Sequence, residues 1–303
     1  TPWGPNGTGF LDFVKDTHFS VDRGFYEDPF EVEITTNTPG AAIYYTLDGS
    51  RPTEATGTPY TGAVAISTTT TLRAAAFKPE FRPTNVDTQT YIFVEDVATQ
   101  TMRSGYPTSW GSAPAVDYDV DPEIALSPQY DNRFIEGLTA IPTMSLVLPV
   151  EDVFGPAGLY SNTRNETLEK AASAELIYPD GREGFQVDAG LKIQGGASRQ
   201  PRKSPKHSLS LRFRRIYGDG RLDFPLFEDS PVDRFNSLQL RAMFNNSWIH
   251  WKSGQRNRGQ MIRDQWMRDS LIAMGQDDAG QGDYVQLYIN GLYWGVYNVH
   301  ERP

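Results

Sequence analysis

The chain has 303 residues, including 38 acidic and 28 basic side chains, and its formal net charge is −10. This length is enough for two or three domains, and the negative charge argues against nucleic-acid binding, which needs a net basic surface. The absence of cysteine excludes disulfides and thiolate chemistry, and the longest apolar run, at 141–150, is about half as long as a membrane span requires, so no span is expected.

The first part of the chain predicts a small β-sandwich. Residues 1–17 are interpreted as a lead-in segment, and residues 18–95 as the sandwich domain. Apolar and acidic residues alternate at 30–34, as in a half-buried strand. Further strands are predicted at 43–47, 63–66, 70–77 and 88–94, with turns at Thr38-Pro39-Gly40 and Asp48-Gly49.

This part of the chain also resembles a known domain. The matching stretches are FSVDRGFY (19–26), IYYTLDGSRPT (43–53), GTPYTGAVAI (57–66), TTTLRAAAF (69–77) and TQTYIF (88–93). They are similar to the β-sandwich at the C-terminus of chitobiase and β-hexosaminidase enzymes. The resemblance implies a fibronectin-type-III-like topology and the role of a spacer, or alternatively contact with a glycan or a cell wall.

Residues 96–140 have little periodicity but contain five aromatic residues, so a linker that is ordered against the next domain is expected. From residue 141 the pattern is α+β. It predicts a mainly antiparallel sheet with one apolar face, whose strands lie at 143–148, 173–178, 185–193, 207–213, 237–244, 285–289 and 292–299. Asn290-Gly291 is the signal for a two-residue hairpin.

One helix is predicted in this second part, at residues 259–274. Five apolar residues share one stripe at helical spacing, and Gly275 is the expected stop: Ile262, Trp266, Met267, Leu271 and Met274. We expect this stripe to cover the apolar face of the sheet.

Basic residues are concentrated between 199 and 221. This stretch contains one acidic residue, Asp219, and eight basic residues: Arg199, Arg202, Lys203, Lys206, Arg212, Arg214, Arg215 and Arg221. Such a cluster favours an anionic partner, either internal carboxylates or a bound phosphate. Just before it, Gly195-Gly196-Ala197-Ser198 predicts a turn at which backbone N–H groups can approach an anion. An ordinary turn beside a solvated basic face is the alternative.

Several templates for catalysis are absent. The sequence has no GxSxG elbow, no HExxH pair and no GxxxxGK[ST] loop, which argues against a serine hydrolase, a zinc hydrolase and a P-loop enzyme. Asp117, Asp119 and Asp121 could bind a hard cation through their oxygens, but their spacing is not that of a regular calcium loop.

Residues 141–303 resemble the N-terminal part of the spore-coat-protein-H (CotH) kinase family. The matching stretches are GLKIQGGASRQPRKSPKHSLSLRFRRIYGDGRLDFPLF (190–227), LQLRAMFNNSW (238–248), IRDQWMRDSLIAMG (262–275) and VQLYINGLYWGVYNVHERP (285–303). The resemblance implies a protein-kinase-like N-terminal lobe from a secreted or cell-surface bacterial protein. The parent protein would use ATP and Mg²⁺ to phosphorylate Ser or Thr of a protein substrate.

The resemblance also implies roles for particular residues. Gly195, Gly196 and Ser198 would lie over the nucleotide phosphates, and Lys206 would pair with phosphate oxygens, with Lys203 and Lys192 as the alternatives.

Two acidic residues complete the candidate site. Asp264 would orient the lysine, or would instead form a surface pair with Arg268 at i,i+4. Glu301 would lie near the adenine at the hinge, whereas Trp294 and Tyr297 are expected in the core.

The family's catalytic base and its Mg²⁺-binding Asp belong to a later lobe. We therefore expect no catalytic residue and no metal ligand in these 303 residues, and no phosphoryl transfer by this chain alone. A non-catalytic structural or adhesive surface module is the alternative.

Overall fold

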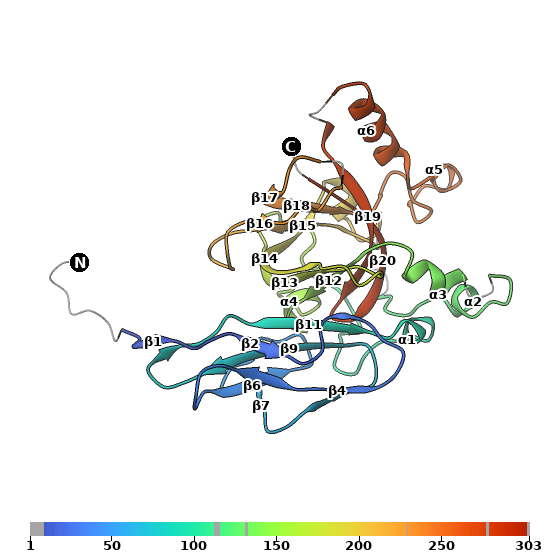
Figure 1. Ribbon diagram of the computed structural model, residues 1–303. Coiled ribbons are helices and arrows are strands. Elements are labelled where there is room, and N and C mark those ends of the chain that lie inside the picture. The colour runs from blue at the N-terminus through green and yellow to red at the C-terminus, as the bar shows by residue number, and fades with distance from the viewer. Residues whose placement is uncertain (1–8, 112–115, 131–132, 229, 277–278, 302–303) are drawn as a thin grey trace. The chain divides into compact units, whose positions relative to one another are not determined.

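The computed structural model describes residues 9–111, 116–130, 133–228, 230–276 and 279–301 (Figure 1). The protein is mainly β, and the chain divides into two compact units, residues 1–93 and 94–303. None of the described helices combines the length and the apolar character needed to cross a bilayer.

The first unit is sandwich-like. One layer is a five-stranded sheet in the order β3 (Gly24–Phe25), β11 (Asp87–Ile92), β9 (Thr70–Phe77), β6 (Ala42–Thr46) and β7 (Thr58–Pro59). The facing strands form two antiparallel pairs, β2 (Thr17–Phe19) with β5 (Ile34–Thr36) and β4 (Phe30–Val32) with β8 (Val64–Ile66). A short parallel pair, β1 (Asp12–Phe13) with β10 (Phe81–Arg82), completes the unit.

Its core comes from both layers. Val32, Ile34 and Ile66 on the paired strands meet Leu72 and Tyr91 of the sheet, and all five are almost completely buried. Each predicted strand of this unit has a counterpart within about two residues, because the period-2 pattern of β-branched and aromatic residues marks the buried face directly.

The second unit is built on a closed seven-stranded barrel. The strand order is β12 (Thr143–Val147), β13 (Lys170–Ile177), β14 (Phe185–Gln194), β15 (Ser208–Arg212), β18 (Ser237–Arg241), β20 (Leu292–Glu301) and β19 (Gly282–Ile289). Neighbouring strands are antiparallel except for β12 and β19, which pair in parallel and close the barrel. A small hairpin, β16 (Leu222–Asp223) with β17 (Arg234–Phe235), lies outside it.

Closure corrects the expectation of a sheet with one apolar face that a helix covers. Leu146, Leu191, Leu211, Leu240 and Leu287 come from five different strands and are buried in one common core. The apolar faces of the strands therefore cover one another, and no helix is needed to cover them.

The helices are short except for α6 (Arg263–Ala273). The others are α1 (Val94–Ala98), α2 (Pro122–Ala125), α3 (Arg133–Leu138), α4 (Val150–Val153), α5 (Ser253–Arg256) and the 3₁₀ turn η1 (Ala197–Arg199). The predicted apolar stripe of α6 does not cover the sheet: Ile262, Trp266, Met267 and Met274 are exposed, and Gln265 is buried instead. The expected covering role was wrong because the barrel fills its own interior.

The described residues just after α1 are bonded to the barrel strands of their own unit. Gln100 exchanges hydrogen bonds with the backbone of Tyr293, accepting one at 2.6 Å and donating one at 3.2 Å. Arg103 donates to the carbonyl oxygens of Asn290 and Gly291 at 2.8 and 3.1 Å. These bonds hold the segment over the start of β20.

Candidate functional site

Lys206 directs its amino group toward the middle of β20. It lies at the end of the connection from β14 to β15, and its Nζ donates to the Val296 carbonyl oxygen at 2.8 Å. The same nitrogen lies 4.4 Å from the centre of the Tyr297 ring. Burial lowers the pKa of Lys206 to about 8. The amino group is thus a cation with a carbonyl and a ring face as neighbours, and it is available to an anion.

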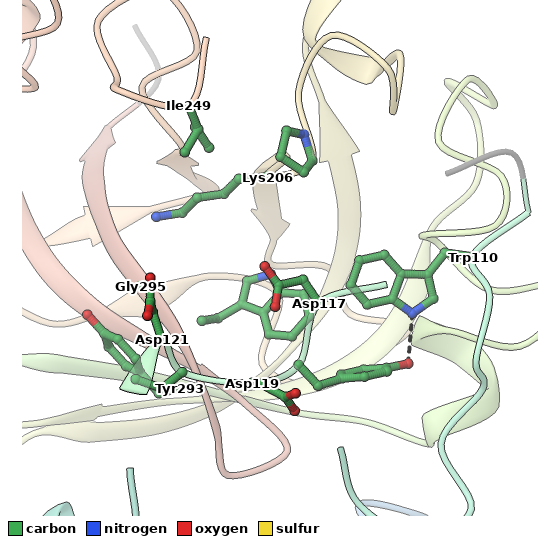
Figure 2. Close-up of a pocket in the computed structure, with 12 residues that line it drawn as sticks. Trp110, Asp117, Asp119, Asp121, Lys206, Ile249, Tyr293 and Gly295 are labelled. Carbon is green, nitrogen blue, oxygen red and sulfur yellow. Dashed lines mark hydrogen bonds between the residues drawn. The ribbon is translucent and has the colours of Figure 1, made fainter. Parts of the chain in front are cut away.

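A cavity of about 330 Å³ opens beside this amino group. Figure 2 shows Lys206 in the upper part of the view, with Gly295 and Tyr293 at one side and Trp110 at the other. The lining residues all belong to the second unit: Trp110, 117–121, Pro205, Lys206, Ile249 and 293–295.

One wall of the cavity is aromatic and held rigidly. Trp110 Nε1 donates to the Tyr118 hydroxyl at 2.7 Å, and Trp294 Nε1 donates to the Tyr160 hydroxyl at 2.6 Å. The rings of Trp110 and Phe154 are stacked, with centres 5.4 Å apart. Because the ring N–H groups already have acceptors within the protein, this wall offers a ligand mainly apolar surface.

Three exposed aspartates, Asp117, Asp119 and Asp121, border the cavity below Lys206 in the view of Figure 2, between Tyr293 and Trp110. Partial burial, with Asp119 and Asp121 close by, raises the pKa of Asp117. The other two have backbone partners: Asp119 accepts from the Met102 N–H at 3.0 Å, and Asp121 caps α2 by accepting from the Glu123 N–H at 2.9 Å. Within the described residues, no group of three or more metal-ligating side chains converges on one point.

The glycine-containing turn lies next to Lys206 but not in the cavity wall. Arg199 fixes the turn by donating from Nε to the Gly195 carbonyl at 2.6 Å and from its guanidinium to the Thr163 carbonyl at 3.0 Å. Ser198 is linked to the residue after Lys206, because its carbonyl oxygen bonds His207 Nδ1 at 2.9 Å. Gly196 faces open space, whereas a Cβ on Gly195 would meet Ser198 Oγ.

The two acidic candidates have other partners. One oxygen of Asp264 accepts from Asn246 Nδ2 at 2.9 Å, and the other pairs with Arg241 at 2.5 Å. Arg268 instead donates to the Ala279 carbonyl at 2.6 Å. Glu301, at the end of β20, accepts from the Gln281 N–H at 2.6 Å. The structure therefore joins Asp264 to β18 and Glu301 to the start of β19, and neither lines the Lys206 cavity.

The alternative lysines also lie elsewhere. Lys192 Nζ donates to the Glu166 carbonyl at 2.6 Å, and Lys203 Nζ lies 5.5 Å from the centre of the Trp251 ring. Much of the basic cluster has internal acidic partners: Arg212 and Arg214 approach Glu169 at 3.9 and 3.2 Å, and Arg221 pairs with Asp223 at 2.9 Å. Internal carboxylates thus neutralise part of the charge that the sequence concentrates at 199–221.

Sequence reasoning did not connect the aromatic and acidic residues with Lys206. Trp110 and Tyr118 belong to a stretch interpreted only as a linker, and Tyr293 and Trp294 to a strand. The one sequence signal was the unusual density of aromatic residues in that linker, which indicated packing but not a cavity.

Comparison with known proteins identifies one part of the chain. The family model described as the chitobiase/β-hexosaminidase C-terminal domain matches residues 21–88, which lie in the first unit and make up less than a quarter of the chain. This confirms the first resemblance. A search of curated proteins found no match. The likeness of residues 141–303 to the CotH kinases has no support from these comparisons.

Proposed function

We propose that residues 94–303 form the phosphate-binding, N-terminal part of an atypical ATP-dependent kinase that phosphorylates Ser or Thr of a protein substrate. The parent would be a secreted or cell-surface bacterial protein, in which the chitobiase-type domain serves as a spacer. The observation that carries the proposal is the amino group of Lys206, which faces a cavity and has a neutral carbonyl as its hydrogen-bond acceptor.

Lys206 suits a phosphate for electrostatic reasons. No carboxylate forms an ion pair with it among the described residues, so its charge is not already neutralised. At pH values below its pKa of about 8, the amino group of Lys206 is mostly protonated. A phosphate oxygen would accept a charge-assisted hydrogen bond in a partly desolvated place, where such bonds are strongest.

The negative charge of the three aspartates determines which form of ATP the cavity would bind. Bare ATP would be repelled by Asp117, Asp119 and Asp121, so the cavity is better suited to a polyphosphate already neutralised by Mg²⁺. The described residues do not themselves fit a Mg²⁺ site, because no three acidic or histidine side chains converge. We expect this chain to bind a nucleotide without transferring its phosphate.

The test is Mg-ATP binding to the 303-residue chain by calorimetry. Lys206→Met retains most of the side-chain volume but removes the charge, and should weaken binding by about tenfold or more, the usual effect of losing a charge-assisted bond. Lys203→Met and Lys192→Met are matched controls that should bind like the wild type. A wild-type chain that does not bind Mg-ATP, or a Lys206→Met chain that binds equally well, would refute the proposal.

A second candidate function is a non-catalytic surface module with a carbohydrate-associated role. The match of residues 21–88 to a domain of chitin-degrading enzymes favours it. Binding of the whole chain to a glycan array, retained by Lys206→Met, would support this reading. An array without signal would leave the first unit as a spacer.

A further inference from the structure

The connection from β18 to β19 has many exposed large apolar side chains. In α6, Trp266 is 63% exposed and Met274, just after the helix, is 77% exposed, while Ile262 and Leu271 are also exposed. Gln265 is the residue of this helix that is buried. A helix of a globular protein normally has the reverse arrangement, so this face indicates an interaction surface.

Polar contacts fix this orientation of α6. Gln265 Oε1 accepts from Asn298 Nδ2 on β20 at 2.9 Å, and Asp264 contacts both Arg241 and Asn246. Arg268 anchors the other end through the Ala279 carbonyl at 2.6 Å. The outward apolar face is therefore the arrangement that the polar residues of this helix specify.

The loop before α6 extends the same kind of surface. Trp248 is 66% exposed, and its Nε1 donates to the Gly259 carbonyl at 3.0 Å, which places it against the chain entering α6. Two amino groups lie near the Trp251 ring, Lys252 Nζ at 4.8 Å and Lys203 Nζ at 5.5 Å from its centre. Figure 1 shows α5 and α6 together on the connection outside the barrel.

This surface is positively charged, although the protein as a whole is acidic. Residues 244–263 contain four basic side chains and no acidic one: Lys252, Arg256, Arg258 and Arg263. Of the two acids of α6, Asp264 pairs with Arg241, whereas Asp269 is exposed and accepts a hydrogen bond from Gln265 at 2.7 Å. We name Trp248, Trp251, Ile262, Trp266 and these four basic residues the aromatic–basic surface.

We propose that the aromatic–basic surface docks on the anionic face of a phospholipid bilayer. The tryptophans would lie at the depth of the headgroups, Ile262 and Leu271 would reach the acyl boundary, and the basic residues would contact anionic headgroups. A nucleic acid would match the charge but leave the aliphatic residues without an apolar partner. A second copy in a two-fold contact would present the same positive charge to itself. This inference does not depend on the proposed nucleotide site.

Sedimentation of the 303-residue chain with phospholipid vesicles tests the proposal. The chain should bind vesicles containing equal parts of anionic and zwitterionic lipid, bind purely zwitterionic vesicles far more weakly, and dissociate at high salt. Trp248→Ser with Trp266→Ser should weaken binding by about tenfold or more, and Arg256→Glu with Arg258→Glu by at least as much. Ile216→Ser and Arg215→Glu, which change exposed residues elsewhere in the second unit, should bind like the wild type.

Circular dichroism and thermal unfolding establish that each variant is folded before binding is compared. A wild-type chain that does not bind anionic vesicles at low salt would overturn the proposal. So would tryptophan variants that bind as well as the wild type, or a dimer in sedimentation velocity that the tryptophan substitutions dissociate. If both heparin binding and vesicle binding survive the tryptophan substitutions, the surface is a general polyanion site. This outcome would also overturn the proposal.

Discussion

Asp87, at the start of β11 in the first unit, lies where its neutral form is favoured. Burial and the neighbouring carboxyl of Asp16 raise its pKa to about 6. The Thr17 hydroxyl donates to one of its oxygens, and Asn85 Nδ2 donates to the other at 2.9 Å. These donors stabilise the ionised form, but they do not offset the desolvation and the second carboxyl.

The raised pKa gives a pH-dependent stability with a definite sign. The pKa of this carboxyl has its ordinary value of 3.8 in the unfolded chain and is about 6 in the folded chain, so folding binds a proton between these pH values. Stability from this group is present at acid pH and is lost as the pH rises through about 4 to 6, with a loss on the order of 3 kcal/mol.

Asp87→Asn should remove this dependence, because the amide can replace the neutral carboxyl. Urea unfolding of the two proteins should give similar free energies near pH 4 and an increasing advantage for the variant up to neutral pH. Asp28→Asn, at an exposed position of the same unit, is the control and should run parallel to the wild type. An advantage for Asp87→Asn that stays constant with pH would contradict the assignment.

At the scale of elements, a bulge in β20 shapes the cavity. Leu287 pairs with Gly295, but the next pair is Tyr288 with Tyr293, which leaves Trp294 as the extra residue. Gly295 has φ +97°, a region that favours glycine. A bulge redirects the side chains around it. Here Trp294 lies against Tyr160, and Gly295 lies beneath Lys206.

Gly295→Ala should disturb both the strand and the site. A Cβ there would lie 2.8 Å from Lys206 Nζ, and the positive φ would be strained for alanine. We expect a loss of about 1 to 3 kcal/mol in the free energy of unfolding and weaker Mg-ATP binding. Gly254→Ala is the control for stability, since Gly254 lies in α5, does not have a positive φ and has no atom near its Cβ position. Equal stability of the two variants would show that the bulge tolerates a side chain.

The sequence predicts those elements whose signals are local. Asn290-Gly291 was identified as a hairpin, and both residues have the positive φ that its turn requires. Barrel closure was missed because it depends on the parallel pairing of Thr143 with Gln286, which no local pattern encodes. The predicted orientation of α6 was wrong because an apolar stripe in a sequence does not show whether that side of the helix packs against the protein or faces solvent.

The candidate site was predictable only in part, for the same reason. Lys206 was singled out by its resemblance to a family motif, whereas Trp110 and Asp117 reach it only through tertiary folding. The only sequence feature that marks the bulge at Trp294 is Gly295. One glycine in a strand is compatible with several structures, so the bulge could not be predicted from it.

At the scale of the whole molecule, each unit has a core of its own. The core of the first unit is built from residues between Phe19 and Phe93, and that of the second from residues between Tyr106 and Val299. The Lys206 cavity is lined wholly by residues of the second unit. Neither folding of the second unit nor its ligand binding should therefore need the first.

A chain of residues 94–303 should accordingly fold and bind as the longer chain does. We expect one cooperative thermal transition and an affinity for Mg-ATP within about threefold of that of the 303-residue chain, because distant sites without shared partners act independently. Lys206→Met should weaken binding equally in both chains, which ties the measurement to the cavity. A shorter chain that lacks a cooperative transition would show that the first unit is needed for folding. A folded shorter chain with much weaker binding would show that the site requires residues before 94.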